Sequence, residues 1–192
     1  MNMNSIRKTI LAALFIALMA IGANAAAVIT IGTVPLTFQT VVAVLAGMLL
    51  GWKTGAASMI GYILLGFTGA PVFSQFHNGF SALASPTFGF ILSFVGIALV
   101  SGLLVEYLPQ KKIRFYLAGA AGLIVNYTIG IVYLYYYNAA VLSFDVAVFY
   151  GIAASMSAFF IKDAVLVFFA ASMAAYLIQS KAVTPVYQNK AG

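Results

Sequence analysis

The sequence predicts an all-α integral membrane protein with six transmembrane helices. Of its 192 residues, 64% are hydrophobic and only 6% are charged, and the mean hydropathy is +1.09. A helix needs about 20 apolar residues to span a hydrocarbon core of about 30 Å, and six apolar segments nearly exhaust the chain. Residues 41–50 do not alternate between polar and apolar, which argues against the strands of a membrane β-barrel.

The basic residues lie on one side of this six-span arrangement. The net charge is +6, and eight of the nine Lys and Arg residues precede the first span, follow the last one or fall in two connections on the same side: Arg7, Lys8, Lys53, Lys111, Lys112, Arg114, Lys181 and Lys190. This distribution follows the positive-inside rule and places both termini in the cytoplasm. It explains the charge without a nucleic-acid partner, so the expected surroundings are the lipid bilayer.

Composition also argues against an enzyme. The chain has no Cys, a single His and three acidic residues, which are too few for most catalytic or metal sites. It has no GxxxxGK[ST] phosphate loop, so we do not expect it to hydrolyse ATP itself. We therefore expect no cofactor and no bound metal.

The first span begins like a secretory signal. Residues 1–27 combine a basic start, an apolar run and an Ala23-Asn24-Ala25 sequence typical of a cleavage site. Because the apolar run continues to residue 31, we take the segment as the first helix and keep cleavage as an alternative. A stripe of small residues on this helix suits either internal packing or a partner helix: Ala13, Ala17 and Ala20.

The second and third spans are short and separated by a turn. Residues 32–35 form an outer turn that ends in Pro35, and residues 36–50 form the second span. Residues 51–54 form a cytoplasmic turn with Trp52 at the interface, and residues 55–67 form the third span.

Between the third and fourth spans lies the longest run in the chain that is not simply apolar. Residues 69–94 contain Ser74, Gln75, His77, Asn78, Ser81, Ser85 and Thr87. Such clustering of hydrogen-bonding groups predicts a binding site. The stretch leads into the fourth span, which we expect to end near residue 104, before Pro109.

The last two spans carry the remaining polar candidates. Residues 116–137 form the fifth span, with Asn126 and Tyr127 inside it and an aromatic belt at residues 133–137. An outer segment with Asp145 leads into the sixth span, residues 153–178. An ionisable residue inside a span costs about 2.5–3.5 kcal/mol, so Asp163 is either functional or neutralised by the adjacent Lys162.

A series of short motifs runs along nearly the whole chain: Val34-Pro35, Thr37, Gln39-Thr40, Gly47, Gly51, Gly69, Pro71-Val72-Phe73, Pro86-Thr87, Gly89 and Asp163. In this order they resemble the motifs of the BioY family, the biotin-specific S components of energy-coupling-factor vitamin transporters. The chain departs from the family pattern at several positions. Residues 75–78 stand in place of a glycine-rich loop, Ser85 in place of a Gly and Phe90 in place of a Tyr. The family's lysine three residues after the Asp is replaced by Leu166.

This resemblance implies one substrate-binding domain over residues 1–192, with an S-component-like bundle in a bacterial cell membrane. It further implies a passive biotin binder that docks on a transmembrane scaffold subunit carrying two ATPase subunits. The small-residue stripe Ala13, Ala17 and Ala20 is then the candidate partner interface.

Biotin offers two ureido N–H donors, one ureido oxygen, apolar rings and a carboxylate. A matching site needs an acceptor, donors and apolar walls. We assign Asp163 as the acceptor, and the full predicted set is Asp163, Asn126, Tyr127, Gln75, Asn78, Ser85, Lys162 and Phe73. Phe76 and Phe80 are further wall candidates. Other roles stay open as alternatives. The Phe residues could simply pack, Asn126 and Tyr127 could form an interhelical hydrogen bond, and His77 could lie in an exposed loop.

Three other functions remain open at this stage. A stand-alone proton-coupled carrier would use Asp163 as its proton site, and a structural or channel-like protein would need no site. A membrane enzyme is the weakest alternative, because His77 and the acidic residues form no catalytic motif.

Overall fold

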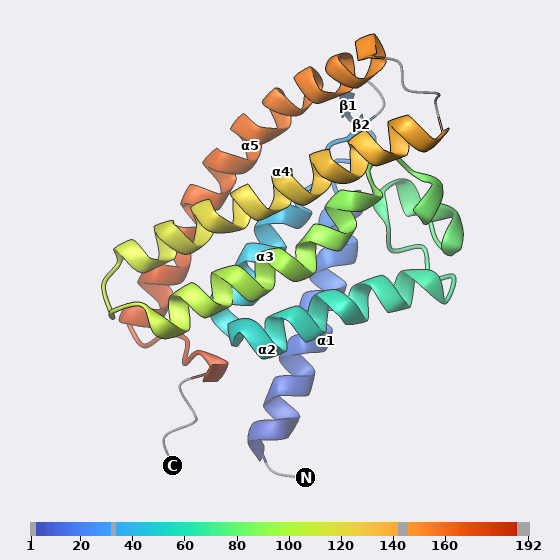
Figure 1. The fold of residues 1–192 in the computed structure, drawn as a ribbon. Helices are drawn as coiled ribbons and strands as arrows, with labels where there is room; N and C mark the ends of the chain where they lie inside the picture. The colour runs from blue at the N-terminus through green and yellow to red at the C-terminus, as the bar shows by residue number, and fades with distance from the viewer. Residues whose placement is uncertain (1–2, 32–33, 142–145, 188–192) are drawn as a thin grey trace.

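The computed structural model describes residues 3–31, 34–141 and 146–187. Within these ranges, five helices are long and apolar enough to cross a membrane. They are α1 (Met3–Asn24), α2 (Gln39–Phe67), α3 (Phe88–Tyr107), α4 (Ile113–Val141) and α5 (Val146–Gln179). Two short 3-10 helices, η1 (Ser74–Phe76) and η2 (Phe80–Ala84), lie between α2 and α3. The fold is therefore all-helical, as the sequence predicted (Figure 1).

The first helix is part of the bundle core. Met19 and Ala23 of α1 have no exposed surface, and Phe15 is also buried. Cleavage after Ala25 would therefore remove packed core residues. A small antiparallel hairpin follows α1, with β1 (Thr30–Ile31) paired to β2 (Val34–Pro35); the first two residues of the turn predicted at 32–35 lie outside the described ranges.

Helix α2 contains a sharp break where the sequence predicted a turn between two spans. Gly51 has φ 78° and ψ 169°, a backbone conformation that is open almost only to glycine. Figure 1 shows the light-blue part before this residue and the turquoise part after it running in different directions. The second part ends at Phe67 with Thr68 as its C-cap, and Gly69, with φ 100°, follows.

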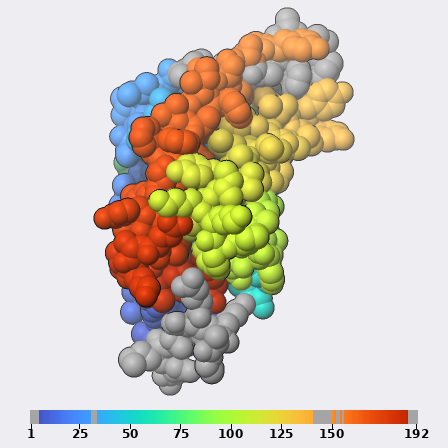
Figure 2. Space-filling model, turned by 90° about the vertical axis from the view of Figure 1, so that its left-hand side faces the viewer, coloured from blue at the N-terminus to red at the C-terminus, as the bar shows by residue number. Residues whose placement is uncertain are grey.

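Sequential helices pack against one another. α1 packs on α2, α2 on α3, α3 on α4 and α4 on α5, and α2 also contacts α5. Figure 2 shows α4 and α5 side by side on one face of the molecule. Proline residues bracket α3, with Pro86 just before it and Pro109 just after it. The Asp145 segment lies outside the described residues.

The two ends of the bundle differ in how they are closed. The hairpin end holds β1, β2 and the segment between α2 and α3. The tail end holds the start of α1, the Gly51 break, the α3–α4 connection and the segment after α5 (Figure 1). At the tail end, Arg7 donates to the carbonyl of Thr184, and Val186 is buried against the bundle.

Candidate functional site

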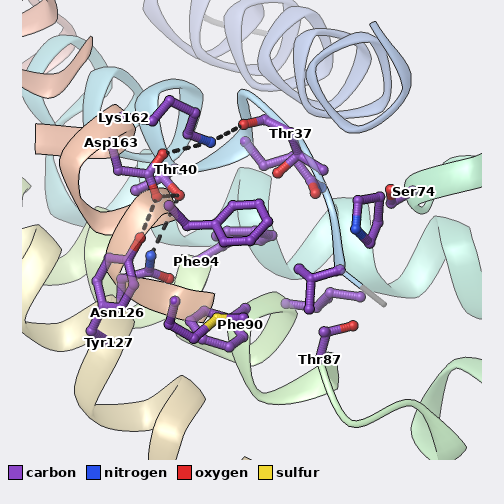
Figure 3. Close-up of a pocket in the computed structure, with 16 residues that line it drawn as sticks. Thr37, Thr40, Ser74, Thr87, Phe90, Phe94, Asn126, Tyr127, Lys162 and Asp163 are labelled. Atoms are coloured by element: carbon purple, nitrogen blue, oxygen red, sulfur yellow. Dashed lines mark hydrogen bonds and ion pairs between the residues drawn. The ribbon is translucent and has the colours of Figure 1, made fainter. Parts of the chain in front are cut away.

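Asp163 on α5 is the centre of a buried polar network near the hairpin end. Its side chain is buried, with 4% of the residue exposed. Thr40 Oγ1 donates to Asp163 Oδ2 at 3.1 Å, and the Tyr127 hydroxyl donates to the same oxygen at 3.0 Å. The Lys162 ammonium lies 2.8 Å from the other oxygen, Oδ1 (Figure 3). Helices α2, α4 and α5 thus all contribute to one carboxylate.

Further side chains hold this network in place. Asn126 Nδ2 donates to Thr40 Oγ1 at 3.4 Å, and Ser93 Oγ donates to Asn126 Oδ1 at 2.6 Å. Lys162 Nζ also donates to the backbone carbonyl of Thr37 at 2.5 Å, in the stretch just before α2. These bonds fix both Asn126 and Lys162, so the network reaches from α3 to the hairpin end.

Asp163 keeps acceptor capacity within this network. An ionised carboxylate offers about four lone-pair sites. Among the described residues, Oδ1 receives no hydrogen bond with proper geometry, although the Lys162 ammonium is close to it. The carboxylate can therefore accept a hydrogen bond from a ligand N–H, provided that the lysine side chain gives way.

An inner cavity of about 80 Å³ lies beside the network (Figure 3). Asp163, Lys162, Tyr127 and Asn126 line one end of it, and aromatic and aliphatic side chains line its walls. The remaining lining residues are Val34, Pro35, Thr37, Gln39, Thr40, Ser74, Thr87, Phe90, Ile91, Phe94, Met156 and Phe159. A mostly apolar space with a few converging polar groups is the usual form of a small-molecule site.

A larger outer cavity of about 350 Å³ continues from the inner one. The two share Pro35, Ser74, Thr87 and Ile91. The others that line it come from the segment between α2 and α3: Phe73, Gln75, His77, Ser81, Ala82, Ala84, Ser85 and Pro86. Tyr133 and Tyr137 of the predicted aromatic belt hold this segment, since their hydroxyls donate to the carbonyls of Leu83 and Ala84.

The structure divides the predicted site residues into three groups. Asp163, Asn126, Tyr127 and Lys162 line the inner cavity. Gln75, Ser85 and Phe73 line the outer cavity. Asn78 is exposed and lines neither cavity, and the same holds for the two wall candidates Phe76 and Phe80.

Sequence reasoning did not single out Met156 and Phe159, which line the inner cavity. They precede Asp163 by seven and four residues and so lie on the same helical face. That spacing is the signal which could have identified them. Thr40 belonged to the family motif, but its hydrogen bond to Asp163 joins residues 123 positions apart and has no sequence signature.

Comparison with known proteins identifies the family of the chain. The model of the BioY family matches residues 1–183. The chain belongs to the BioY family. BioYB of Bacillus subtilis is 41% identical over 118 residues, which is 59% of each chain and thus less than two thirds of that relative. The biotin transporter BioY of Thermotoga maritima is 39% identical over 132 residues, covering 68% of this chain and 76% of the relative.

A solved structure shares the fold. The S component for biotin from an ECF-type ABC transporter superposes with a TM-score of 0.72 at 20% identity, covering 90% of this chain and 94% of that one. BioY relatives are named as transporters and not as enzymes, in agreement with the prediction from composition. These comparisons do not favour the stand-alone proton-coupled carrier.

Proposed function

We propose that this chain is the biotin-binding S component of an energy-coupling-factor importer in a bacterial cell membrane. The observation that carries the proposal is a buried carboxylate, Asp163, with spare acceptor capacity at the end of an apolar cavity. Membership of the BioY family and the biotin transporters among its relatives support biotin as the transported ligand rather than a cofactor. Residues 1–192 then act as one substrate-binding domain.

In this proposal the ureido ring lies at the inner end of the cavity. Asp163 accepts from a ureido N–H, while Asn126 and Lys162 supply donors for the ureido oxygen. Tyr127 acts through Asp163, because its hydroxyl already donates to that carboxylate. Phe90, Phe94 and Phe159 line the same cavity and surround the ring system with apolar surface. Gln75, Ser85 and Phe73 contact the rest of the ligand from the outer cavity.

Equilibrium binding to the purified, detergent-solubilised chain tests this proposal. Saturable binding of biotin is expected, while thiamine and riboflavin, which lack biotin's fused imidazolidinone and thioether rings, should not compete. Absence of biotin binding by a correctly folded chain would refute the proposal. Uptake by the chain alone that collapses with a protonophore would instead support a carrier.

The proposal also requires a surface for the scaffold subunit and its two ATPases. Ala13 and Ala17 of α1 are exposed, whereas Ala20 is partly buried and packs against the core. Small exposed side chains let another helix approach closely. Ala13→Leu with Ala17→Leu should abolish copurification with the scaffold and leave biotin binding intact. Ala57→Leu, at an exposed alanine of α2, is the matched control and should copurify normally.

We further propose that the parts of α2 before and after Gly51 each cross the bilayer, which gives six crossings with both termini in the cytoplasm. The basic residues of the α3–α4 connection then face the cytoplasm. Cysteine at Val28, which is 95% exposed after α1, should be labelled only from outside. Cysteine at the exposed Lys112 should be labelled only from the cytoplasm. The opposite result at either position would refute this topology.

A further inference from the structure

The inner and outer cavities adjoin each other, since they share four lining residues, and together they extend from Asp163 towards the surface. Ser74 and Thr87 line both cavities, and Figure 3 shows them at the end away from Asp163. The outer cavity reaches solvent, because Gln75 and Ser81 along its wall are exposed. The inner cavity is the smaller, at about 80 Å³ against about 350 Å³. A ligand whose head is held at Asp163 therefore directs its tail into the outer cavity.

Charge is confined to the inner end of this space. Of the described residues that line the two cavities, Lys162 and Asp163 are the only Lys, Arg, Asp or Glu, and both line the inner one. The outer cavity offers hydroxyl groups, one amide and the His77 imidazole among apolar side chains. A ligand carboxylate in this outer cavity thus meets no Lys or Arg.

The reverse orientation is unfavourable. Lys162 already lies 2.8 Å from Asp163 Oδ1 and donates to the Thr37 carbonyl at 2.5 Å. A ligand carboxylate at the inner end would add a second buried negative charge beside Asp163, which costs free energy in a low-dielectric site. The tail carboxylate therefore belongs at the outer end, where water can solvate it.

We propose that this site also binds biotin whose carboxyl group is amide-linked, such as the ε-amide of lysine, with the amide substituent lying in the outer cavity. The proposal rests on the proposed biotin-binding function and extends its substrate class. Converting the carboxylate to a neutral amide removes no charged partner in the outer cavity, whose lining hydroxyl and amide groups can hydrogen-bond either form. The 350 Å³ outer cavity gives the added substituent room before it reaches solvent.

Competition binding with biotin, biotinamide and ε-N-biotinyl-lysine on the purified full chain tests the proposal. Both amides should bind less than about 10-fold more weakly than biotin, because a lost charge-assisted bond would cost about 10- to 150-fold. Weakening of 10-fold or more by both amides, with biotin binding normally, would overturn the extension and leave the proposed function standing. If biotin itself fails to bind, the proposed function fails instead.

Two exposed positions in the same segment test the route of the substituent. Ser81 lines the outer cavity, whereas Leu83 lines neither cavity. Ser81→Trp should raise the ratio of the biotinyl-lysine Kd to the biotin Kd by at least about 5-fold, because the indole occupies the space of the substituent. Leu83→Trp should leave that ratio unchanged. Equal ratios in the two variants would show that the substituent does not pass through the outer cavity.

Discussion

Asp163 and Glu106 are two carboxylates with opposite surroundings. Asp163 is buried beside a cavity at the hairpin end, where it accepts hydrogen bonds from side chains of two other helices. Glu106 is partly buried at the tail end, where its Oε1 accepts from the backbone N–H of Trp52 at 3.0 Å. Thr40 contacts Asp163 and Gly51 lies beside Glu106, and the helix between Thr40 and Gly51 is about 16 Å long at 1.5 Å per residue.

The difference shows that a carboxylate can face a cavity at one end of the bundle and accept from a backbone amide at the other. At the hairpin end, polar side chains converge on the inner cavity. Two non-glycine residues at this end, Gln75 and Phe76, have positive φ values of 58° and 59°. Such strain persists only where the surrounding structure enforces it, and it clusters at functional sites. At the tail end, a positive φ falls on Gly51, where it costs little, and on one non-glycine residue, Lys181, in the segment after α5. The following variants test this division.

The largest effect is expected from Asp163→Asn. The amide keeps the size of the side chain but replaces one acceptor oxygen with a donor, so a charge-assisted bond to a ureido N–H is lost. Biotin affinity should fall roughly 10- to 150-fold with yield and folding preserved, as measured by equilibrium binding. Glu106→Gln is the matched control at the tail end and should keep wild-type affinity. Wild-type affinity in Asp163→Asn would remove this residue as the ureido acceptor.

The next largest effect is expected at the tail end, from Gly51→Ala. An added Cβ would lie 2.2 Å from Glu106 Oε1, and the φ of 78° disfavours any side chain. The strain should cost about 1–3 kcal/mol of stability, seen as a lower Tm in detergent, with biotin affinity unchanged. Gly151→Ala is the control, because its added Cβ meets nothing within 4 Å. A loss of biotin affinity in Gly51→Ala would contradict the view that the tail end serves stability and not binding.

Much of the fold could be predicted from the sequence because membrane insertion leaves a direct signal in composition. Apolar runs predicted the five long helices, and Gly51 to Thr54 marked the break in α2. The first run, predicted as helix to residue 31, extended too far, since α1 ends at Asn24 and Thr30–Ile31 form a strand. Within the site, Asp163 stood out because an ionisable group inside a span is costly. Asn126, Tyr127 and Lys162 were predicted along with it and line the same cavity.

The division of the site into two cavities could not be predicted. It depends on how the segment between α2 and α3 folds back, and that path is set by long-range contacts such as Tyr133 with Leu83. Local polarity placed Asn78 with Gln75 in one group, yet only Gln75 faces a cavity. A pattern of polar residues predicts that a segment lines a site, but it does not predict which side chains turn inward.

A moderate effect on binding kinetics is expected from Asn24→Ala. Asn24 Oδ1 accepts from the backbone N–H of the strained Phe76 at 2.9 Å, and its Nδ2 donates to the Ala20 carbonyl at 3.0 Å. Losing the first bond removes about 0.5–1.5 kcal/mol of stabilisation from the segment between α2 and α3, so biotin should dissociate roughly 2- to 10-fold faster in a chase experiment. Asn24→Asp keeps the acceptor and should restore the slow rate. An unchanged dissociation rate in Asn24→Ala would show that the hydrogen bond from Phe76 to Asn24 of α1 does not slow the release of biotin.

The smallest effect is expected from Tyr187→Phe at the tail end, and it should appear only at high pH. Burial raises the pKa of Tyr187 to about 12, with the Arg114 charge lowering it and Glu106 raising it. The folded state thus favours the neutral phenol. Its stabilising contribution is complete below the ordinary pKa of 10 and is lost as the pH rises through 12. Among the described residues the hydroxyl has no hydrogen-bond partner, so the Phe variant should match the wild-type Tm at pH 8. Between pH 10 and pH 12 the wild-type Tm should fall more steeply than that of the variant, while biotin affinity measured at pH 8 stays equal. Parallel Tm curves over that range would show that Tyr187 is not held in a buried, neutral state by the tail end.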